Sequence, residues 1–202
     1  MKQHKWSKLA EAFDFASKKH QHQLRKSTNI PYVSHLMSVS ALVLEHGGNE
    51  DQAIAGLLHD VIEDADSADQ IPMIRKEILN RFGPIVLELV EGCTDGEPDA
   101  TGNKSDWKSR KVAYIAHLEN KSTDLLLVSC CDKLHNARSI LTDLITHGNV
   151  MFDRFTAKQT ETLWYYRSLS DLYSKRLNGL GGQIAARELA YTVGEIERIA
   201  NS

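Results

Sequence analysis

The stretch Leu57–Asp64, with the sequence LLHDVIED, places one histidine and three carboxylates inside a run of apolar residues with helical spacing. Moving an unpaired ion into a protein interior costs several kcal/mol, even after the surroundings relax. A helix that carries His59 and Asp60 into a core therefore needs a compensating partner, and a divalent cation is the simplest one. Such a cation needs further ligands, so the fold has to bring distant segments to this stretch.

Two other segments supply matching side chains. His35 lies upstream, and Asp132 lies downstream in the stretch CCDKLHN, residues 130–136. Together with His59 and Asp60 they provide two imidazoles and two carboxylates. Such a mixed set of nitrogen and oxygen ligands suits manganese, iron or zinc better than calcium. Four protein ligands leave positions open for water and a substrate oxygen, so we expect a catalytic rather than a structural metal site.

The alternative is that these residues are unrelated: a hydrogen-bonded core histidine, a capping aspartate and a surface ion pair. We favour the metal site because Asp132 lies between the apolar segments 125–128 and 140–141. A lone carboxylate at such a position would be costly to bury.

Glu63 and Asp64 follow Asp60 by three and four residues, so a helical period places both near the face that carries the metal. One of them would orient or deprotonate the attacking water, and the other would protonate the leaving oxygen. The alternative is an acidic pair that faces solvent at the end of a helix. Acidic residues at a helix C-terminus oppose the helix dipole, so we favour the catalytic interpretation.

Three polar residues are candidates for substrate contacts. Asn136 lies one helical turn after Asp132 and is placed to bond substrate or water, whereas the alternative is a polar surface position. Arg25 and Lys26 precede His35 in a polar segment and would bind phosphate oxygens, Arg25 with its bidentate fork. The alternative for this pair is a solvated surface.

Apolar residues recur at helical spacing along most of the chain, which predicts an all-α fold of about nine helices. The predicted helices cover about residues 6–19, 32–45, 51–63, 70–81, 85–92, 107–119, 123–146, 157–178 and 183–200. The sequence shows no convincing strand or internal repeat, and residues 94–105 form its one long polar loop. A length of 202 residues suits a single domain. We expect a core over about residues 6–147 and a helical extension over about residues 152–202.

Composition excludes several classes of function. A formal net charge of −3 argues against a general nucleic-acid binder, which usually carries a basic excess. No apolar run approaches the roughly 18 residues of a membrane-spanning helix, and the N-terminal residues lack the apolar region of a signal peptide. The three cysteines show no paired spacing, so we expect buried free thiols and a cytoplasmic location. The sequence does not indicate an oligomeric state.

Three blocks of the sequence, residues 23–35, 59–64 and 132–136, occur in a distinctive order and spacing. In these blocks the chain resembles the HD-domain phosphohydrolases. More narrowly, it is similar to the hydrolase half of the bifunctional stringent-response enzymes and to their single-domain relatives, the small alarmone hydrolases. The similarity covers roughly residues 6–144.

The resemblance implies an all-helical fold and a specific site. The resemblance implies a metal, typically manganese, that is held by His35, His59, Asp60 and Asp132. It implies that Glu63 and Asp64 are catalytic. It also implies that Arg25, Lys26 and Asn136 contact the substrate. The implied substrate is a small nucleotide, with no nucleic-acid or membrane partner. The implied reaction removes the 3′-pyrophosphate of guanosine tetra- and pentaphosphate, giving a guanine nucleotide and pyrophosphate.

Two alternatives stay open from the sequence. The same site would also suit another purine nucleotide, such as an adenosine alarmone, a nucleoside monophosphate or NADPH. A non-catalytic metal or nucleotide sensor is the second alternative, but it would be expected to lack a ligand or the Glu63–Asp64 pair, and this chain keeps both.

The chain also departs from the bifunctional enzymes. They carry a lysine after the threonine that corresponds to Thr94, whereas Asp95 follows here, as in the metazoan single-domain type. Phosphate contacts would then fall to basic residues in and after the polar loop: Lys104, Lys108, Arg110 and Lys111. No synthetase domain follows residue 202, so we expect hydrolysis alone. The aromatic residues Trp164, Tyr165, Tyr166 and Tyr173 are interpreted as packing residues.

Overall fold

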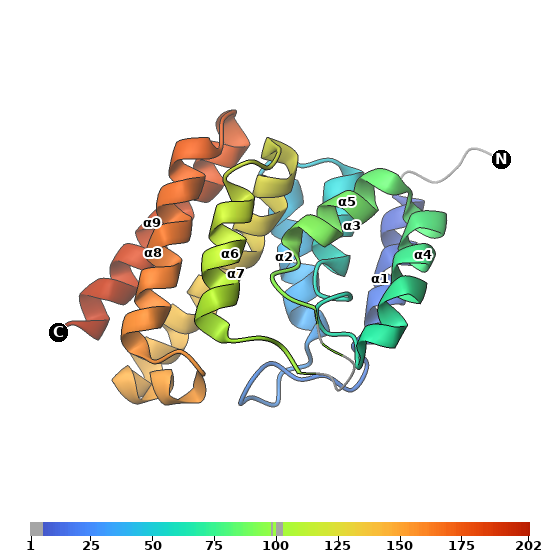
Figure 1. Ribbon diagram of the computed structural model, residues 1–202. Helices are drawn as coiled ribbons and strands as arrows, with labels where there is room; N and C mark the ends of the chain where they lie inside the picture. Colours follow the sequence, from blue (N-terminus) through green and yellow to red (C-terminus); the bar gives the residue numbers. More distant parts are fainter. Residues whose placement is uncertain (1–5, 98, 100–102) are drawn as a thin grey trace.

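A computed structural model describes residues 6–97, 99 and 103–202 (Figure 1). Within these residues the regular structure is helical, apart from one isolated β-bridge between Leu24 and Pro31. The α-helices are α1 Ser7–Lys19, α2 Val33–Glu45, α3 Glu50–Leu58, α4 Ile71–Phe82, α5 Pro84–Cys93, α6 Trp107–Leu118, α7 Thr123–His147, α8 Gln159–Arg176 and α9 Leu180–Ala200. Two 3₁₀-helices, η1 Ala68–Gln70 and η2 Gly148–Arg154, were not predicted. The all-α prediction is confirmed.

Helix α7 lies in the middle of the molecule and contacts both of its sides (Figure 1). Helices α2, α3 and α5 pack against it on one side, and α8 and α9 pack on the other. The sequence explains the central position of α7. The leucines and the valine at 125–128 are buried on all sides of the helix, and Leu134, Ile140 and Leu144 continue the core. A helix that is apolar on all sides belongs in the interior.

Helix α3 ends at Leu58, so the prediction of a helix that reaches Glu63 is wrong at this end. The His59 Nδ1 atom lies 2.9 Å from the Gly56 carbonyl oxygen. In a continued helix that oxygen would accept from the Asp60 N–H, so the ring competes with the helical bond. One turn persists beyond this point, because the Asp64 N–H donates to the Asp60 carbonyl at 2.8 Å. Asp60 and Asp64 therefore remain one turn apart.

Helix α9 begins at Leu180, three residues before the predicted start, inside a glycine-containing segment that lay between the two predicted helices. Gly179 precedes the helix with a φ of 77°, which suits glycine. Gly181 lies against the end of α2, where an added Cβ would lie 1.9 Å from the His46 carbonyl oxygen. This glycine therefore marks a close approach of two backbones rather than a helix end.

Aromatic residues of α8 contribute to the core. Tyr165 and Tyr173 are buried, which confirms their interpretation as packing residues, whereas Trp164 and Tyr166 are half-buried. The three cysteines are buried and free, as predicted. No helix among the described residues has the length and apolar character needed to cross a bilayer. The division into a core and an extension stays a prediction.

Candidate active site

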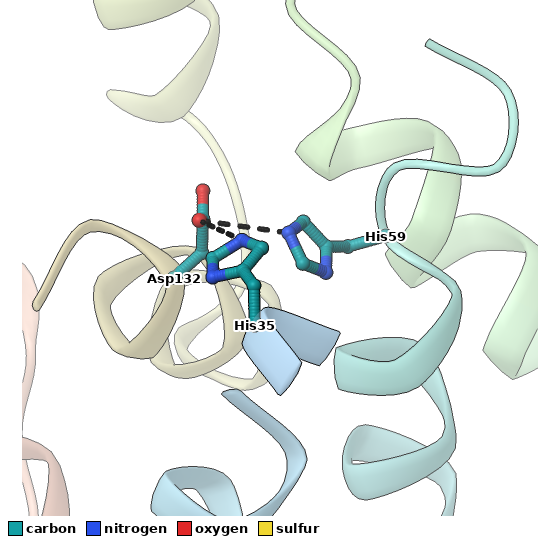
Figure 2. Close-up of side chains that lie close together, drawn as sticks. All are labelled: His35, His59 and Asp132. Atoms are coloured by element: carbon teal, nitrogen blue, oxygen red, sulfur yellow. Dashed lines mark ion pairs between the residues drawn. The ribbon is translucent and has the colours of Figure 1, made fainter. Parts of the chain in front are cut away.

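His35, His59 and Asp132 form a buried cluster of side chains from three distant segments (Figure 2). One ligand atom from each lies within 4.8 Å of the others. The Asp132 Oδ1 atom is 3.2 Å from His35 Nε2 and 3.5 Å from His59 Nε2. Figure 2 shows both imidazole rings turned toward this oxygen. The helices thus bring together two imidazoles and a carboxylate, as the sequence suggested.

Asp60 borders this cluster. Its Oδ2 atom lies 3.0 Å from His59 Nε2 and 3.8 Å from His35 Nε2, and it accepts a hydrogen bond of 2.5 Å from the Tyr32 hydroxyl. Among the described residues, the tight group includes His35, His59 and Asp132 without Asp60. All four side chains lie together, while their roles as metal ligands stay a prediction.

The His59 ring shows that these residues fit a cation. The Gly56 carbonyl can only accept, so the proton of a neutral His59 ring lies on Nδ1. The Nε2 atom then carries a lone pair, is buried, and has no hydrogen-bond partner among the described residues. It lies within 3.5 Å of carboxylate oxygens from Asp60 and Asp132. A histidine that donates one N–H to a backbone carbonyl and leaves the other nitrogen free is typical of a metal ligand.

The charges of the cluster also favour a cation. Burial disfavours protonation of His59, but the Asp60 and Asp132 carboxylates raise the pKa of His59 well above its usual range. Burial likewise raises the pKa of Asp132, but Lys133 and His59 outweigh this effect and lower it well below the usual range. The Lys133 Nζ atom lies 2.6 Å from Asp132 Oδ2. The carboxylates therefore stay ionised and attract positive charge. Without a metal they favour a proton on His59 Nε2, and a bound cation would take the place of that proton.

His135 is a residue that the sequence reasoning missed. Its Nδ1 atom lies 2.8 Å from the Nδ1 atom of His35. Burial, His35 and Arg25 lower the pKa of His135 to about 4, so the ring is neutral at pH 7. A neutral pair can share one proton between these nitrogens, which orients the His35 ring. The sequence could have indicated His135, because it follows Asp132 by three residues and so lies on the same side of the helix.

Glu63 and Asp64 lie beside the cluster and share a basic partner. The Lys104 Nζ atom lies 2.9 Å from Glu63 Oε1 and 3.4 Å from Asp64 Oδ1, and the Gln23 amide donates to Asp64 Oδ2 at 2.8 Å. Desolvation and the neighbouring Asp60 carboxylate raise the pKa of Asp64. A raised pKa suits a group that gives up a proton. The catalytic roles of the pair stay predictions.

A cavity of about 660 Å³ reaches Asp132 of this cluster, and its size suits a drug-sized or nucleotide-sized ligand. Its lining includes Asp60, Glu63 and Asp132, the predicted substrate residues Arg25, Lys26 and Asn136, and the aromatic residues Phe155 and Tyr166. The Arg25 guanidinium donates to Asn136 Oδ1 at 2.7 Å, and the Asn136 amide donates to Asp132 Oδ1 at 2.6 Å. Asp64 does not line the cavity. The structure therefore joins the predicted substrate residues to the cluster.

The four basic residues in and after the polar loop have different surroundings. Lys111 lines the cavity, and burial together with Lys133 lowers its pKa to about 8. Arg110 and Lys111 both pair with the buried carboxylate of Asp95. Lys108 lies over the Trp164 ring, with Nζ 3.2 Å from the ring centroid. Of these four residues, only Lys111 forms part of the cavity wall.

Comparison with known proteins identifies the family of this chain. A family described as "HD domain" matches residues 12–163. The chain belongs to the HD domain family. This HD domain chain is 35% identical over 138 residues to the guanosine-3′,5′-bis(diphosphate) 3′-pyrophosphohydrolase MESH1 of Homo sapiens, a match that covers 66% of this chain and 70% of that protein. The Xenopus tropicalis protein of the same name is 34% identical over 135 residues, covering 65% of this chain and 69% of that protein.

Longer relatives match over a small part of their length. The guanosine-3′,5′-bis(diphosphate) 3′-pyrophosphohydrolase of Aquifex aeolicus is 34% identical over 132 residues, which is 65% of this chain but 18% of that protein. A solved structure titled "A metazoan ortholog of SpoT hydrolyzes ppGpp and plays a role in starvation responses" has a TM-score of 0.69 and 25% identity, covering 94% of this chain and 97% of that one. A Listeria monocytogenes structure, at 24% identity and a TM-score of 0.67 over 83% of this chain and 99% of that one, shares the fold.

Proposed function

We propose that this HD-domain chain is a metal-dependent hydrolase that removes the 3′-pyrophosphate of guanosine tetra- and pentaphosphate. The products would be a guanine nucleotide and pyrophosphate. The observation that carries the proposal is the buried cluster of His35, His59 and Asp132, whose Asp132 lines a cavity with basic side chains in its wall. The names of the relatives support the choice of substrate, since several are named as 3′-pyrophosphohydrolases of this nucleotide.

In this proposal the cation is held by His35, His59, Asp60 and Asp132, and manganese is the proposed ion because it accepts both imidazole and carboxylate ligands. When bound, such a cation polarises phosphoryl oxygens and lowers the pKa of water near it. The Nε2 atom of His59, which is buried and has no hydrogen-bond partner within residues 6–97, 99 and 103–202, supports this ligand set. Asn136 and Lys133, which both bond Asp132, would hold its carboxylate in place.

Glu63 and Asp64 are proposed to move the protons. Glu63 lines the cavity, so it would accept a proton from the attacking water as the new phosphorus–oxygen bond forms. The bond from phosphorus to the 3′-oxygen breaks. Asp64, whose pKa is raised but which does not line the cavity, would pass its proton to the leaving oxygen through a water molecule. Lys104 contacts both carboxylates and would keep them close together. The pair would regain its starting state by exchanging protons with solvent.

The wall of the cavity would bind the substrate. Arg25 and Lys26 lie on it as cations, and a guanidinium matches two phosphate oxygens at once. Lys111, half-buried and paired with Asp95, adds a further basic group on the wall. These side chains suit a ligand with several phosphates rather than a neutral one.

The test is a substrate panel with manganese-loaded protein. The panel contains guanosine tetraphosphate, its adenosine counterpart, NADPH and nucleoside monophosphates, and the released products are identified. Pyrophosphate released from guanosine tetraphosphate supports the proposal. Release of inorganic phosphate from NADPH or a monophosphate, with guanosine tetraphosphate left intact, would instead support the alternative substrates.

The matched control is the variant His59→Asn. An asparagine amide can take the place of Nδ1 as a donor to the Gly56 carbonyl, but it offers no atom at the place of Nε2. Turnover that depends on this site disappears in the variant, whereas a contaminating hydrolase would leave it unchanged.

A further inference from the structure

Two carboxylates of the site are held by donors from the segment between α1 and α2. The Gln23 amide donates to Asp64 Oδ2 at 2.8 Å, and the Tyr32 hydroxyl donates to Asp60 Oδ2 at 2.5 Å. Gln23 and Tyr32 have no role as ligands or proton donors in the proposed function. Their hydrogen bonds nevertheless fix where the two carboxylate groups point.

His20 contacts both of these donors. It caps the C-terminus of α1 and is 5% exposed. Its Nδ1 atom lies 2.6 Å from Gln23 Oε1. Its ring stacks on the Tyr32 ring, with centroids 5.2 Å apart and an angle of 26° between the planes. One buried ring thus touches the donor to Asp64 and the donor to Asp60.

The hydrogen-bond directions indicate which nitrogen of His20 carries the proton. The Asp64 Oδ2 atom accepts from the Gln23 amide nitrogen, so the amide turns its nitrogen toward Asp64 and its oxygen toward His20. The His20 Nδ1 atom must then donate. The Nε2 atom is buried and has no hydrogen-bond partner in the described part of the chain. A proton on Nε2 would leave a buried donor unsatisfied, which costs free energy, so the neutral ring with its proton on Nδ1 fits both observations.

We propose that His20 is a positioning residue that orients Gln23 and Tyr32, and through them the carboxylates of Asp64 and Asp60. It does not line the cavity, so it has no direct contact with a substrate there. The inference rests on the proposed function, because the orientation of the two carboxylates matters for catalysis only if they act as proposed. The position of the ring proton, however, can be measured without any substrate.

The backbone of this segment is held by bonds of its own. The Gln23 N–H donates to the His20 carbonyl at 3.0 Å, and the Tyr32 N–H donates to the Gln23 carbonyl at 2.9 Å. A change of the His20 side chain leaves these bonds available. Substitutions at position 20 therefore test the side-chain contacts rather than the course of the chain.

Two variants separate the contacts of His20. His20→Phe keeps an aromatic ring against Tyr32 but loses the donor to Gln23, and His20→Asn keeps an N–H close to the place of Nδ1 but loses the ring. The matched control is His22→Phe, two residues further along at an exposed position. We expect kcat of His20→Phe to fall about tenfold with KM unchanged, as is usual for residues that orient the groups of a metal site. We expect His20→Asn to recover most of this loss, and His22→Phe to match the wild type.

Two kinetic results would overturn the proposal. The first is a His20→Phe variant with the kcat of the control. The second is a His20→Asn variant as impaired as His20→Phe, which would show that the hydrogen bond to Gln23 does not carry the effect.

A second measurement does not depend on turnover. Nitrogen-15 NMR of the imidazole groups in the metal-free wild type should show the His20 proton on Nδ1, and the Gln23 side-chain amide signals should shift in His20→Phe but not in His22→Phe. A proton on Nε2 would contradict the proposed bond even if catalysis is observed. If His20→Phe fails to fold, the wild-type spectrum alone still tests whether His20 Nδ1 carries the proton. If guanosine tetraphosphate is not hydrolysed, the proposed function fails while the His20 contacts can still be confirmed.

Discussion

Helix α7 carries two buried polar positions that differ in how their hydrogen bonds are completed. The Ser129 hydroxyl lies 2.7 Å from the Tyr114 hydroxyl and 2.6 Å from the Tyr173 hydroxyl, so protein groups alone satisfy it. Three residues later, Asp132 faces His35 and His59, and the His59 Nε2 atom has no hydrogen-bond partner in the part of the chain that the structure describes. A satisfied buried network stabilises a fold, whereas an incomplete one requires an explanation. The contrast separates a structural polar group from a site that awaits a ligand.

The largest effect is expected from breaking the incomplete network. The variant His59→Asn should lose both bound metal and turnover, because the nitrogen that faces Asp60 and Asp132 is removed. Metal content by mass spectrometry and the rate of pyrophosphate release measure the two losses. Retention of both would show that His59 is an ordinary core histidine.

The next effect concerns the carboxylates beside the cluster. The double variant Glu63→Gln with Asp64→Asn should bind metal as the wild type does, while kcat falls by about 10²–10⁴, the usual contribution of general acid–base groups. Metal titration and steady-state kinetics on the same preparation test this. Turnover that persists undiminished would remove the proposed proton-transfer roles.

Removal of the metal should lower the stability of the fold, which tests whether a metal completes the network around Asp132. A ligand that binds the folded state at a hundred times its Kd adds about 2.7 kcal/mol to the free energy of unfolding. The free energy of unfolding of the wild type, measured in urea, should therefore fall by about this amount when a chelator replaces excess manganese. The His59→Asn variant should show no response to the chelator, and an equal response would place the stabilising metal elsewhere.

The smallest effect is expected in the completed network. Tyr173→Phe removes one of the two hydroxyls that contact Ser129 and should lower the free energy of unfolding by about 1 kcal/mol, the net worth of one hydrogen bond. Its kcat should equal that of the wild type. A large loss of activity would mean that the two networks along α7 are coupled.

Much of the fold was predictable because apolar periodicity reports burial directly. The long apolar run of α7 and the carboxylate of Asp132 within it pointed to the site, since an ion in such surroundings needs a partner. The helix ends were less predictable. His59 shortens α3 through a side-chain bond to Gly56, and Gly181 lies within α9 because of a contact with the end of α2. Both effects depend on neighbours that a periodicity argument does not see.

The residues that hold the carboxylates of the site, Gln23 and Tyr32, were not predictable for a related reason. Gln23 lies in the segment between α1 and α2, and Tyr32 directly precedes the first residue of α2. Their contacts with Asp64 and Asp60 join residues separated by 41 and 28 positions along the chain. Residue type alone does not say where an amide or a phenol will point, because that direction follows from how the helices pack.

The packing of α9 along α7 has a practical consequence for anyone who shortens this protein. The similarity to the family ends at residue 163, inside α8, whereas Leu189, Val193 and Ile196 of α9 are buried in the common core. A truncation at residue 163 would remove α9 and expose the apolar side chains that it buries. Exposed apolar surface is a frequent cause of aggregation. Gene fusions that aim to transplant the catalytic unit should therefore carry α9 with it.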